Sequence, residues 1–126
     1  MALRRILVVD DDADLRQSVR MTLVKAGYEV IVAEDGEKAI AAVQAGDNPR
    51  KADLIICDLY MPKVGGVEAI AYFRSHLPAV PVIAMTGSQD ISSAESLFRQ
   101  GIVEFLLKPV GPSELLGAVA KALKDR

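Results

Sequence analysis

Five side chains suited to phosphate chemistry follow short apolar runs in this sequence. Asp10 and Asp11 come directly after I-L-V-V, and Asp58 comes directly after L-I-I-C. Thr86 follows V-I-A-M, and Lys108 follows F-L-L. Carboxylates bind hard cations, and an aspartate can act as a covalent nucleophile toward phosphoryl groups. Three carboxylates, a hydroxyl and an ammonium therefore suit phosphoryl transfer to a carboxylate, if the fold brings these positions together.

The three acids predict a bound divalent cation. Two carboxylates about 5 Å apart repel by roughly 3 kcal/mol at an effective dielectric of about 20, so such a cluster is costly unless it is neutralised. Mg²⁺ typically takes one or two carboxylates, keeps several waters and adds phosphate oxygens. We expect Asp11 and Asp58 to be direct Mg²⁺ ligands and Asp10 to bind through water. The backbone carbonyl of Tyr60 is a further candidate ligand, whereas a simple capping turn at 10–12 would need only one acid.

The elements that must position these residues alternate between strand and helix patterns. Short apolar runs bounded by turn residues predict strands, and apolar residues spaced three and four apart predict helices. Asp12 and Ser113 are expected N-caps, and Gly27 is expected just beyond the end of the first helix. The predicted strands cover 6–9, 29–33, 54–57, 80–85 and 104–107, and the predicted helices cover 14–26, 37–45, 66–76, 91–100 and 113–124.

Strands and helices that alternate through right-handed crossovers form a parallel sheet with helices on both faces. The first and third strands are the most hydrophobic and should be central. The expected fold class is α/β, a flavodoxin-like (βα)5 doubly wound parallel sheet with strand order 2-1-3-4-5. The carboxyl ends of the first and third strands then flank the switch point where ligands bind, which would place Asp10 and Asp11 beside Asp58.

Composition narrows the function classes. The 126 residues suit one domain, so residues 1–126 are predicted to be a single domain with a sizeable core. A net charge of −2 gives no bulk attraction to nucleic acid or anionic lipid. There is no apolar run near the roughly 18 residues of a membrane helix, and the single cysteine fits a cytoplasmic protein without disulfides. Neither a dinucleotide-binding glycine motif nor a P-loop is present.

The motifs together resemble the receiver domain of bacterial two-component response regulators, and the resemblance covers essentially the whole chain. It is carried by V-V-D-D at 8–11, D-L-Y-M-P at 58–62 with Gly66, M-T-G at 85–87 and F-L-L-K-P at 105–109. The resemblance implies roles for the strand-end residues. These are Asp58 as phosphoacceptor, Asp10 and Asp11 as the acidic pair, Thr86 as the hydroxyl switch and Lys108 as the phosphate contact.

The resemblance also covers Phe105 and the bond that follows Lys108. Phe105 falls at the family's switch aromatic, which turns inward when Thr86 moves toward the phosphoryl group, although an ordinary core aromatic remains the alternative. The peptide bond between Lys108 and Pro109 is expected to be cis.

The chain departs from the family pattern near Asp58. Gly65 stands where the family usually has Asp or Asn, so the next helix is expected to lack a side-chain cap. Tyr60 is bulky for its place two residues after Asp58 and is expected to slow the attacking water or a phosphatase.

The implied function is a signalling switch rather than an enzyme acting on an external substrate. A histidine kinase or phosphotransfer protein would present phosphohistidine to Asp58, and the domain would catalyse its own Mg²⁺-dependent phosphorylation and slow autodephosphorylation. The surface of 91–100, 104–107 and 113–124 would rearrange and bind a downstream protein partner. No direct nucleic-acid or membrane contact is expected, and a phosphorylation-dependent dimer is left open.

Two other function classes are weighed against the switch. A haloacid-dehalogenase-type phosphohydrolase also uses an aspartate after a buried strand, but it needs a second acid where this chain has Tyr60. A phosphorylation-independent docking module would keep the fold alone, and the complete set of strand-end residues argues against it.

Overall fold

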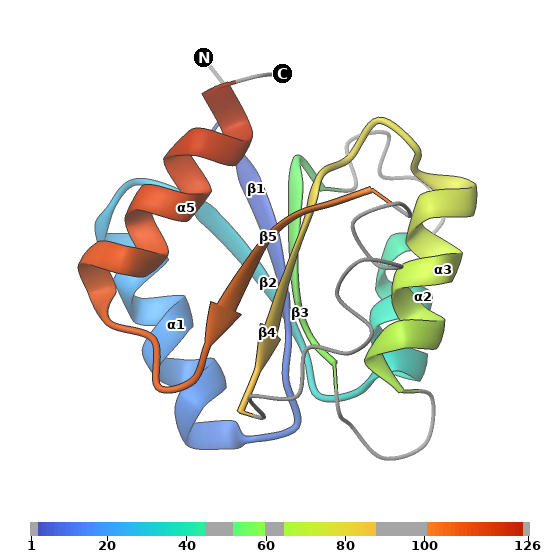
Figure 1. The fold of residues 1–126 in the computed structure, drawn as a ribbon, viewed down its shortest axis with the longest axis horizontal. Helices are drawn as coiled ribbons and strands as arrows, with labels where there is room; N and C mark the ends of the chain where they lie inside the picture. The colour runs from blue at the N-terminus through green and yellow to red at the C-terminus, as the bar shows by residue number, and fades with distance from the viewer. Residues whose placement is uncertain (1–2, 45–51, 60–64, 88–100, 125–126) are drawn as a thin grey trace.

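The computed structural model describes residues 3–44, 52–59, 65–87 and 101–124, and their path is drawn in Figure 1. Five parallel strands form one sheet in the order β2-β1-β3-β4-β5, which confirms the predicted order. The strands are β1 (Arg5–Val9), β2 (Glu29–Ala33), β3 (Leu54–Asp58), β4 (Val82–Thr86) and β5 (Ile102–Leu107). The helices of the described residues are α1 (Ala13–Lys25), α2 (Gly36–Gln44), α3 (Gly66–His76) and α5 (Pro112–Lys124). The helix predicted over 91–100 lies outside the described residues.

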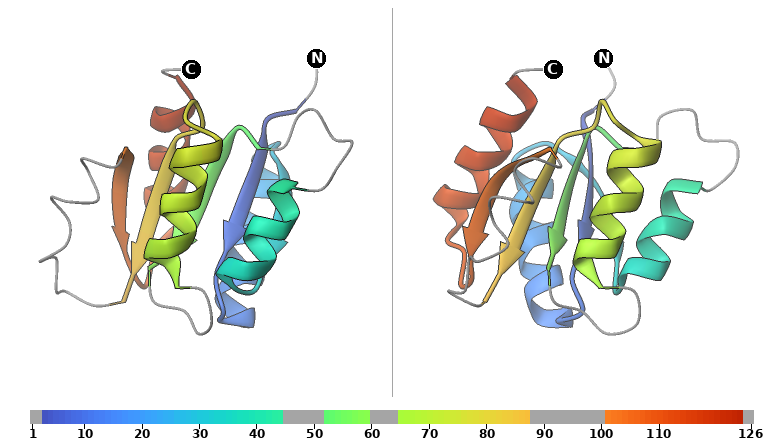
Figure 2. Two further views of the ribbon diagram at one scale, coloured as in Figure 1. Left: turned by 90° about the vertical axis from the view of Figure 1, so that its right-hand side faces the viewer. Right: turned by 45° about the vertical axis from the view of Figure 1, so that its right-hand side comes forward.

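The helices form two layers, one on each face of the sheet. In Figures 1 and 2, α1 and α5 lie together on one face, and α2 and α3 lie together on the other. Successive residues of β1 point to opposite faces, so Ile6 and Val8 pack toward α1 and α5 while Leu7 and Val9 pack toward α2 and α3. All four side chains are buried. Burial on both faces explains why the central strands read as continuous apolar runs rather than as alternating ones.

The ends of α1 are fixed by the residues that the sequence indicated. The Asp12 carboxylate accepts hydrogen bonds from the backbone N–H groups of Asp14 at 3.0 Å and Leu15 at 3.2 Å, as expected of an N-cap. At the other end Gly27 has a φ of +100°, in the left-handed region that favours glycine. The strong N-cap sets where α1 begins, directly after the acidic turn.

Some predicted element bounds are wrong. The strand predicted over 80–85 spans Val82–Thr86 instead. It begins after Pro81, because proline has no N–H to donate to the ladder. The strand predicted to begin at 104 begins at Ile102. Ser113 is not an N-cap, since α5 begins at Pro112 and the Leu115 N–H donates to the Gly111 carbonyl at 3.0 Å. Proline is well suited to the first helical position, because its missing N–H has no helical partner there.

No helix in the described ranges combines the length and apolar character needed to cross a bilayer.

Candidate functional site

The carboxyl ends of four strands deliver the predicted site residues to one edge of the sheet. The strand ends are aligned by the parallel register, in which Val9 pairs with Cys57, Asp58 with Met85 and Thr86 with Leu107. Figure 2 shows the arrowheads of the strands ending along this common lower edge. Asp10 and Asp11 follow β1, Asp58 ends β3, Thr86 ends β4 and Lys108 follows β5.

Three carboxylates meet at this edge. One oxygen each from Asp10, Asp11 and Asp58 lies within 4.8 Å of the others, so the acids of two separate segments are adjacent, as predicted. Asp10 is 0% exposed and Asp58 is 3% exposed, whereas Asp11 is exposed. The buried carboxylates of Asp10 and Asp58 are therefore expected to need a compensating cation.

Lys108 supplies one such cation. Its Nζ lies 2.9 Å from Asp58 Oδ2 and 2.9 Å from Asp10 Oδ2. The backbone N–H of Lys108 donates to the Thr86 carbonyl at 2.8 Å, which extends the β4–β5 ladder to the lysine itself. Partial burial alone would lower the pKa of Lys108, but the hydrogen bonds and charges of Asp10 and Asp58 outweigh it and raise the pKa. The ammonium therefore stays charged between the two buried carboxylates.

The Asp10 carboxylate is held so that one oxygen remains available at the site. Its Oδ1 accepts a hydrogen bond from the Asp12 N–H at 2.9 Å. Its Oδ2 is buried and pairs only with the Lys108 ammonium among the described residues. A buried carboxylate oxygen left in this way, beside two further carboxylates of which Asp11 is open to solvent, fits the all-oxygen ligand set of a hard divalent cation. The residues present could therefore hold such a metal.

The remaining predicted residues surround this cluster or lie outside the described chain. Thr86 is 2% exposed, and a Cβ placed on the exposed Gly87 beside it would meet no heavy atom nearer than Lys108 Cδ at 4.0 Å. Phe105 is half-buried and packs against the hydrophobic cluster on the α2 and α3 side. The Lys108–Pro109 bond is cis, as expected from the family resemblance. Tyr60, the candidate carbonyl ligand, lies outside the described residues.

The start of α3 is pressed against the phosphoacceptor candidate. A Cβ on Gly66 would lie 1.9 Å from the Asp58 carbonyl oxygen and 2.6 Å from Leu59 Cα. Only glycine, which has no Cβ, avoids these steric clashes. Gly65 makes no side-chain cap, as expected, and its N–H donates to the Glu68 carboxylate at 3.3 Å instead. Glycine at position 66 therefore allows α3 to begin directly against the backbone of Asp58 and Leu59.

One contact at the site was missed by sequence reasoning. Arg16, in the second turn of α1, donates from Nη1 to the Asp10 backbone carbonyl at 2.8 Å. The available signal was its position on the helix that directly follows the acidic turn, from which a long side chain can reach back over the first turn.

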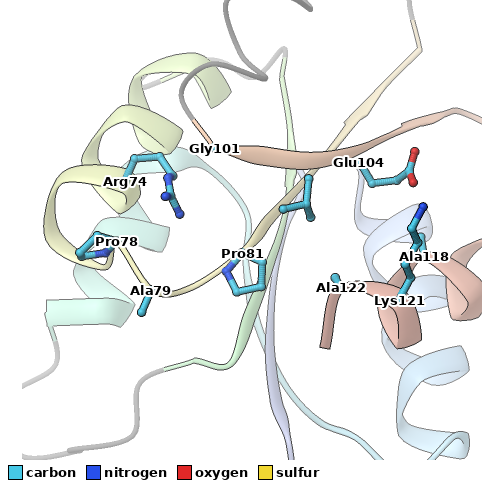
Figure 3. Close-up of a pocket in the computed structure, with 10 residues that line it drawn as sticks. Arg74, Pro78, Ala79, Pro81, Gly101, Glu104, Ala118, Lys121 and Ala122 are labelled. Carbon is cyan, nitrogen blue, oxygen red and sulfur yellow. The ribbon is translucent and has the colours of Figure 1, made fainter. Parts of the chain in front are cut away.

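A cavity of about 300 Å³ lies at the opposite end of the sheet (Figure 3). Arg74 of α3 and Lys121 of α5 stand on its two sides, with Gly101 and Glu104 of the β5 region between them. None of the residues predicted to act at the acidic edge lines it.

Comparisons with known proteins agree with this arrangement. The sequence profile of the response regulator receiver domain matches residues 6–120. The transcriptional regulatory protein GlrR of Escherichia coli strain K12 is 34% identical over 120 residues, which are 95% of this chain and 26% of GlrR. This chain therefore spans about a quarter of that relative.

Solved structures with a similar fold are also receiver proteins. A CheY-like response regulator receiver domain protein from Methanospirillum hungatei JF-1 has a TM-score of 0.90 and 27% identity, covering 98% of this chain and 96% of that one. The chemotaxis protein CheY4 of Vibrio cholerae has a TM-score of 0.86 and 32% identity, covering 97% of this chain and 100% of that one.

Proposed function

Because this chain belongs to the response regulator receiver domain family, a family of signalling modules, we propose that Asp58 accepts a phosphoryl group from a phosphohistidine. The donor would be a histidine kinase or a phosphotransfer protein. One observation carries the proposal: Asp58 shares a cluster with Asp10 and Asp11 and is paired at 2.9 Å with the Lys108 ammonium. A carboxylate nucleophile, a place for a cation and a fixed positive charge are the parts that phosphoryl transfer requires.

The transfer breaks one bond and forms another. An Asp58 carboxylate oxygen attacks phosphorus, the P–N bond to the donor imidazole breaks, and the electron pair stays on the imidazole nitrogen. The Lys108 ammonium contacts Asp58 Oδ2. It would shift to contact a phosphoryl oxygen and stabilise the negative charge that develops there. Mg²⁺ bound by Asp11 and Asp58, by Asp10 through water and by the Tyr60 carbonyl would supply further positive charge to the phosphoryl oxygens. Slow loss of the group to water would reset the domain.

The switch would follow from what Thr86 and Phe105 do after transfer. The Thr86 hydroxyl, buried at the end of β4, would turn toward a phosphoryl oxygen and leave space that Phe105 fills. Moving such a two-state equilibrium from 1:99 to 99:1 requires about 5.5 kcal/mol, which several charge-assisted contacts to a phosphoryl group can supply. The altered surface would comprise 91–100, β5 and α5, where a downstream protein partner or a second phosphorylated copy binds.

Residues 1–126 would act as one receiver unit in the cytoplasm, where the phosphoryl donors are made. Within the described chain the single cysteine, Cys57, is a free and buried thiol, in keeping with that location. Neither nucleic acid nor membrane would contact this unit directly. The downstream partner would be a protein.

Intact-mass measurement with acetyl phosphate and Mg²⁺ tests the proposal. The wild-type chain should gain one phosphoryl group, and the Asp58→Asn variant should gain none, because an amide oxygen is a poor nucleophile. Asp14→Asn is the matched control, since Asp14 is an exposed acid on α1 and should leave uptake unchanged. Continued labelling of Asp58→Asn would move the chemistry to another residue.

Measurements of released phosphate and of Mg²⁺ binding separate the alternatives. A phosphohydrolase would release phosphate in large excess over protein, whereas a receiver releases it slowly after one transfer; the comparisons give no support to the haloacid-dehalogenase alternative. A docking module that keeps only the fold would gain no phosphoryl group and would bind no Mg²⁺.

A further inference from the structure

We propose that Arg16 is a positioning residue that holds the Asp10–Asp11 turn in the geometry that binds the divalent cation. The inference rests on the proposed function, because it concerns the same metal site. Arg16 is half-buried on α1, and its Nη1 donates to the Asp10 carbonyl oxygen at 2.8 Å. The guanidinium therefore contacts the main chain of the acidic turn.

The other polar groups of Asp10 are already fixed in other directions. The Asp10 N–H donates to the Ala33 carbonyl at 3.1 Å, which continues the pairing of β1 with β2. The Asp10 Oδ1 accepts from the Asp12 N–H at 2.9 Å. These bonds hold the amide and the side chain of Asp10, and the carbonyl is left to Arg16.

The Asp10 carbonyl affects the metal site because its peptide bond leads to Asp11. It lies in the same rigid peptide plane as the N–H of Asp11, so the bond from Arg16 sets the orientation of that plane. The plane in turn sets where the Cα of Asp11 lies, and with it the exposed carboxylate that joins Asp10 and Asp58 in the acid cluster. Groups that orient metal ligands in this way typically change metal affinity by about 10–100-fold when they are removed.

The charge of Arg16 and its proposed positioning role predict opposite changes in Mg²⁺ affinity when Arg16 is replaced. The direction of the measured change therefore tests the proposal. Arg16 is a positive charge close to the acidic turn, and a positive charge opposes the binding of Mg²⁺. If Arg16 acted only through its charge, its removal would tighten Mg²⁺ binding. If it acts by holding the turn, its removal loosens Asp11 and weakens binding.

The test is a calorimetric titration of Mg²⁺ into wild-type, Arg16→Met and Arg16→Lys protein. Met keeps the aliphatic stem and a good helix propensity but removes every donor and the charge, whereas Lys keeps a positively charged donor group of similar reach. We expect about tenfold weaker binding for Arg16→Met and an intermediate affinity for Arg16→Lys. Arg20→Met is the control, because Arg20 is exposed one turn further along α1, and its affinity should equal that of the wild type.

Thermal unfolding of the metal-free proteins is measured in parallel, so that a loss of affinity can be separated from a loss of stability. Binding by Arg16→Met that is as tight as wild type, or tighter, would overturn the positioning role. Equal weakening in Met and Lys variants together with a lower melting temperature would also overturn it, because general destabilisation then explains the result. In either case, a wild-type chain that binds Mg²⁺ and takes up a phosphoryl group keeps the proposed function intact.

Discussion

The Lys108 ammonium balances part of the negative charge of the acid cluster. It lies 2.9 Å from one oxygen of each of the two buried carboxylates, Asp10 and Asp58. The proposed metal would neutralise the same cluster. A cationic side chain and a divalent ion that share the same oxygens make partly redundant contributions to stability, so the effect of removing one depends on the presence of the other.

Replacing Lys108 with Met removes the ammonium and keeps most of the aliphatic stem. In metal-free buffer we expect the free energy of unfolding to fall by roughly 1.5–3 kcal/mol, the range for a hydrogen bond to a charged group. The loss should be smaller in saturating Mg²⁺, because the metal neutralises the oxygens that Lys108 leaves. Urea denaturation in both buffers measures the two values, with Lys121→Met, an exposed lysine of α5, as control. The same loss in both buffers would mean that Lys108 and the metal do not share these oxygens.

The raised pKa of Lys108 gives this difference a defined pH dependence. A lysine has a pKa of about 10.4 in the unfolded chain, and its value in the folded protein is higher. With both carboxylates ionised, at neutral pH and above, the ion pairs therefore contribute their full stability up to about pH 10, and the contribution is lost as the pH rises through the folded-state pKa of Lys108. The stability difference between wild type and Lys108→Met should stay constant from neutral pH to about pH 10 and shrink in more strongly alkaline buffer.

At the scale of elements, the start of α3 is set by its approach to the end of β3. The Gly66 N–H donates to the Leu59 carbonyl at 3.2 Å, and its Cα faces the Asp58 carbonyl without room for a side chain. The atoms that a Cβ would meet belong to the backbone, so no rotamer change can relieve the contact. The position of the helix and the position of the phosphoacceptor are therefore coupled.

Gly66→Ala should separate α3 from β3. We expect a loss of stability of roughly 1–3 kcal/mol or more, the range for overpacked sites, together with slower phosphoryl uptake by the displaced Asp58. Gly117→Ala is the matched control, because Gly117 lies exposed in α5 with no heavy atom within 4 Å of the added Cβ. That change should stabilise the protein by about 0.5–1 kcal/mol. Equal effects of the two changes in urea denaturation would contradict the close packing at Gly66.

Sequence patterns predicted the elements that have a strong local signal. The strand order and the meeting of Asp10 and Asp11 with Asp58 followed from two facts: the most apolar strands must be central, and parallel strands end at one edge. The Asp12 cap of α1 followed from a short acid placed directly before a helical pattern. These features depend on few residues and on rules that hold for most α/β sheets.

Two features could not be predicted from sequence patterns: the start of α5 and the contact of Arg16 with Asp10. The first depends on competition between neighbouring residues, and the second on the direction of a side chain. Ser113 is a good capping residue, but Pro112 before it prefers the first helical turn and moves the helix start forward. Arg16 reads as an ordinary solvated helix residue, and only the folded turn shows that its side chain reaches Asp10. The metal contact of Tyr60 and the helix over 91–100 stay predictions.

At the scale of the whole molecule, the acidic edge rests on a sheet that is covered on both faces. Cys57 lies in the centre of that sheet, in β3 between β1 and β4, and is 0% exposed. Its Sγ donates to the backbone carbonyl of Asp58 at 3.4 Å, so the thiol contacts the main chain of the phosphoacceptor candidate. Burial, followed by the charges of Asp58 and Asp10, raises the pKa of Cys57. The folded protein therefore holds no reactive thiolate.

Cys57 should consequently report on opening of the whole core. We expect an aromatic disulfide reagent at mildly alkaline pH to label the folded chain at least about 10³-fold more slowly than the urea-unfolded chain, because the thiol reacts only in molecules that have opened. If opening is global, the labelling rate should rise with urea in proportion to the unfolded fraction, and it should fall in Mg²⁺, since a ligand that binds only the folded state reduces that fraction. Rapid labelling without urea, with the far-ultraviolet dichroism unchanged, would instead mean that β3 opens locally beside the phosphorylation site.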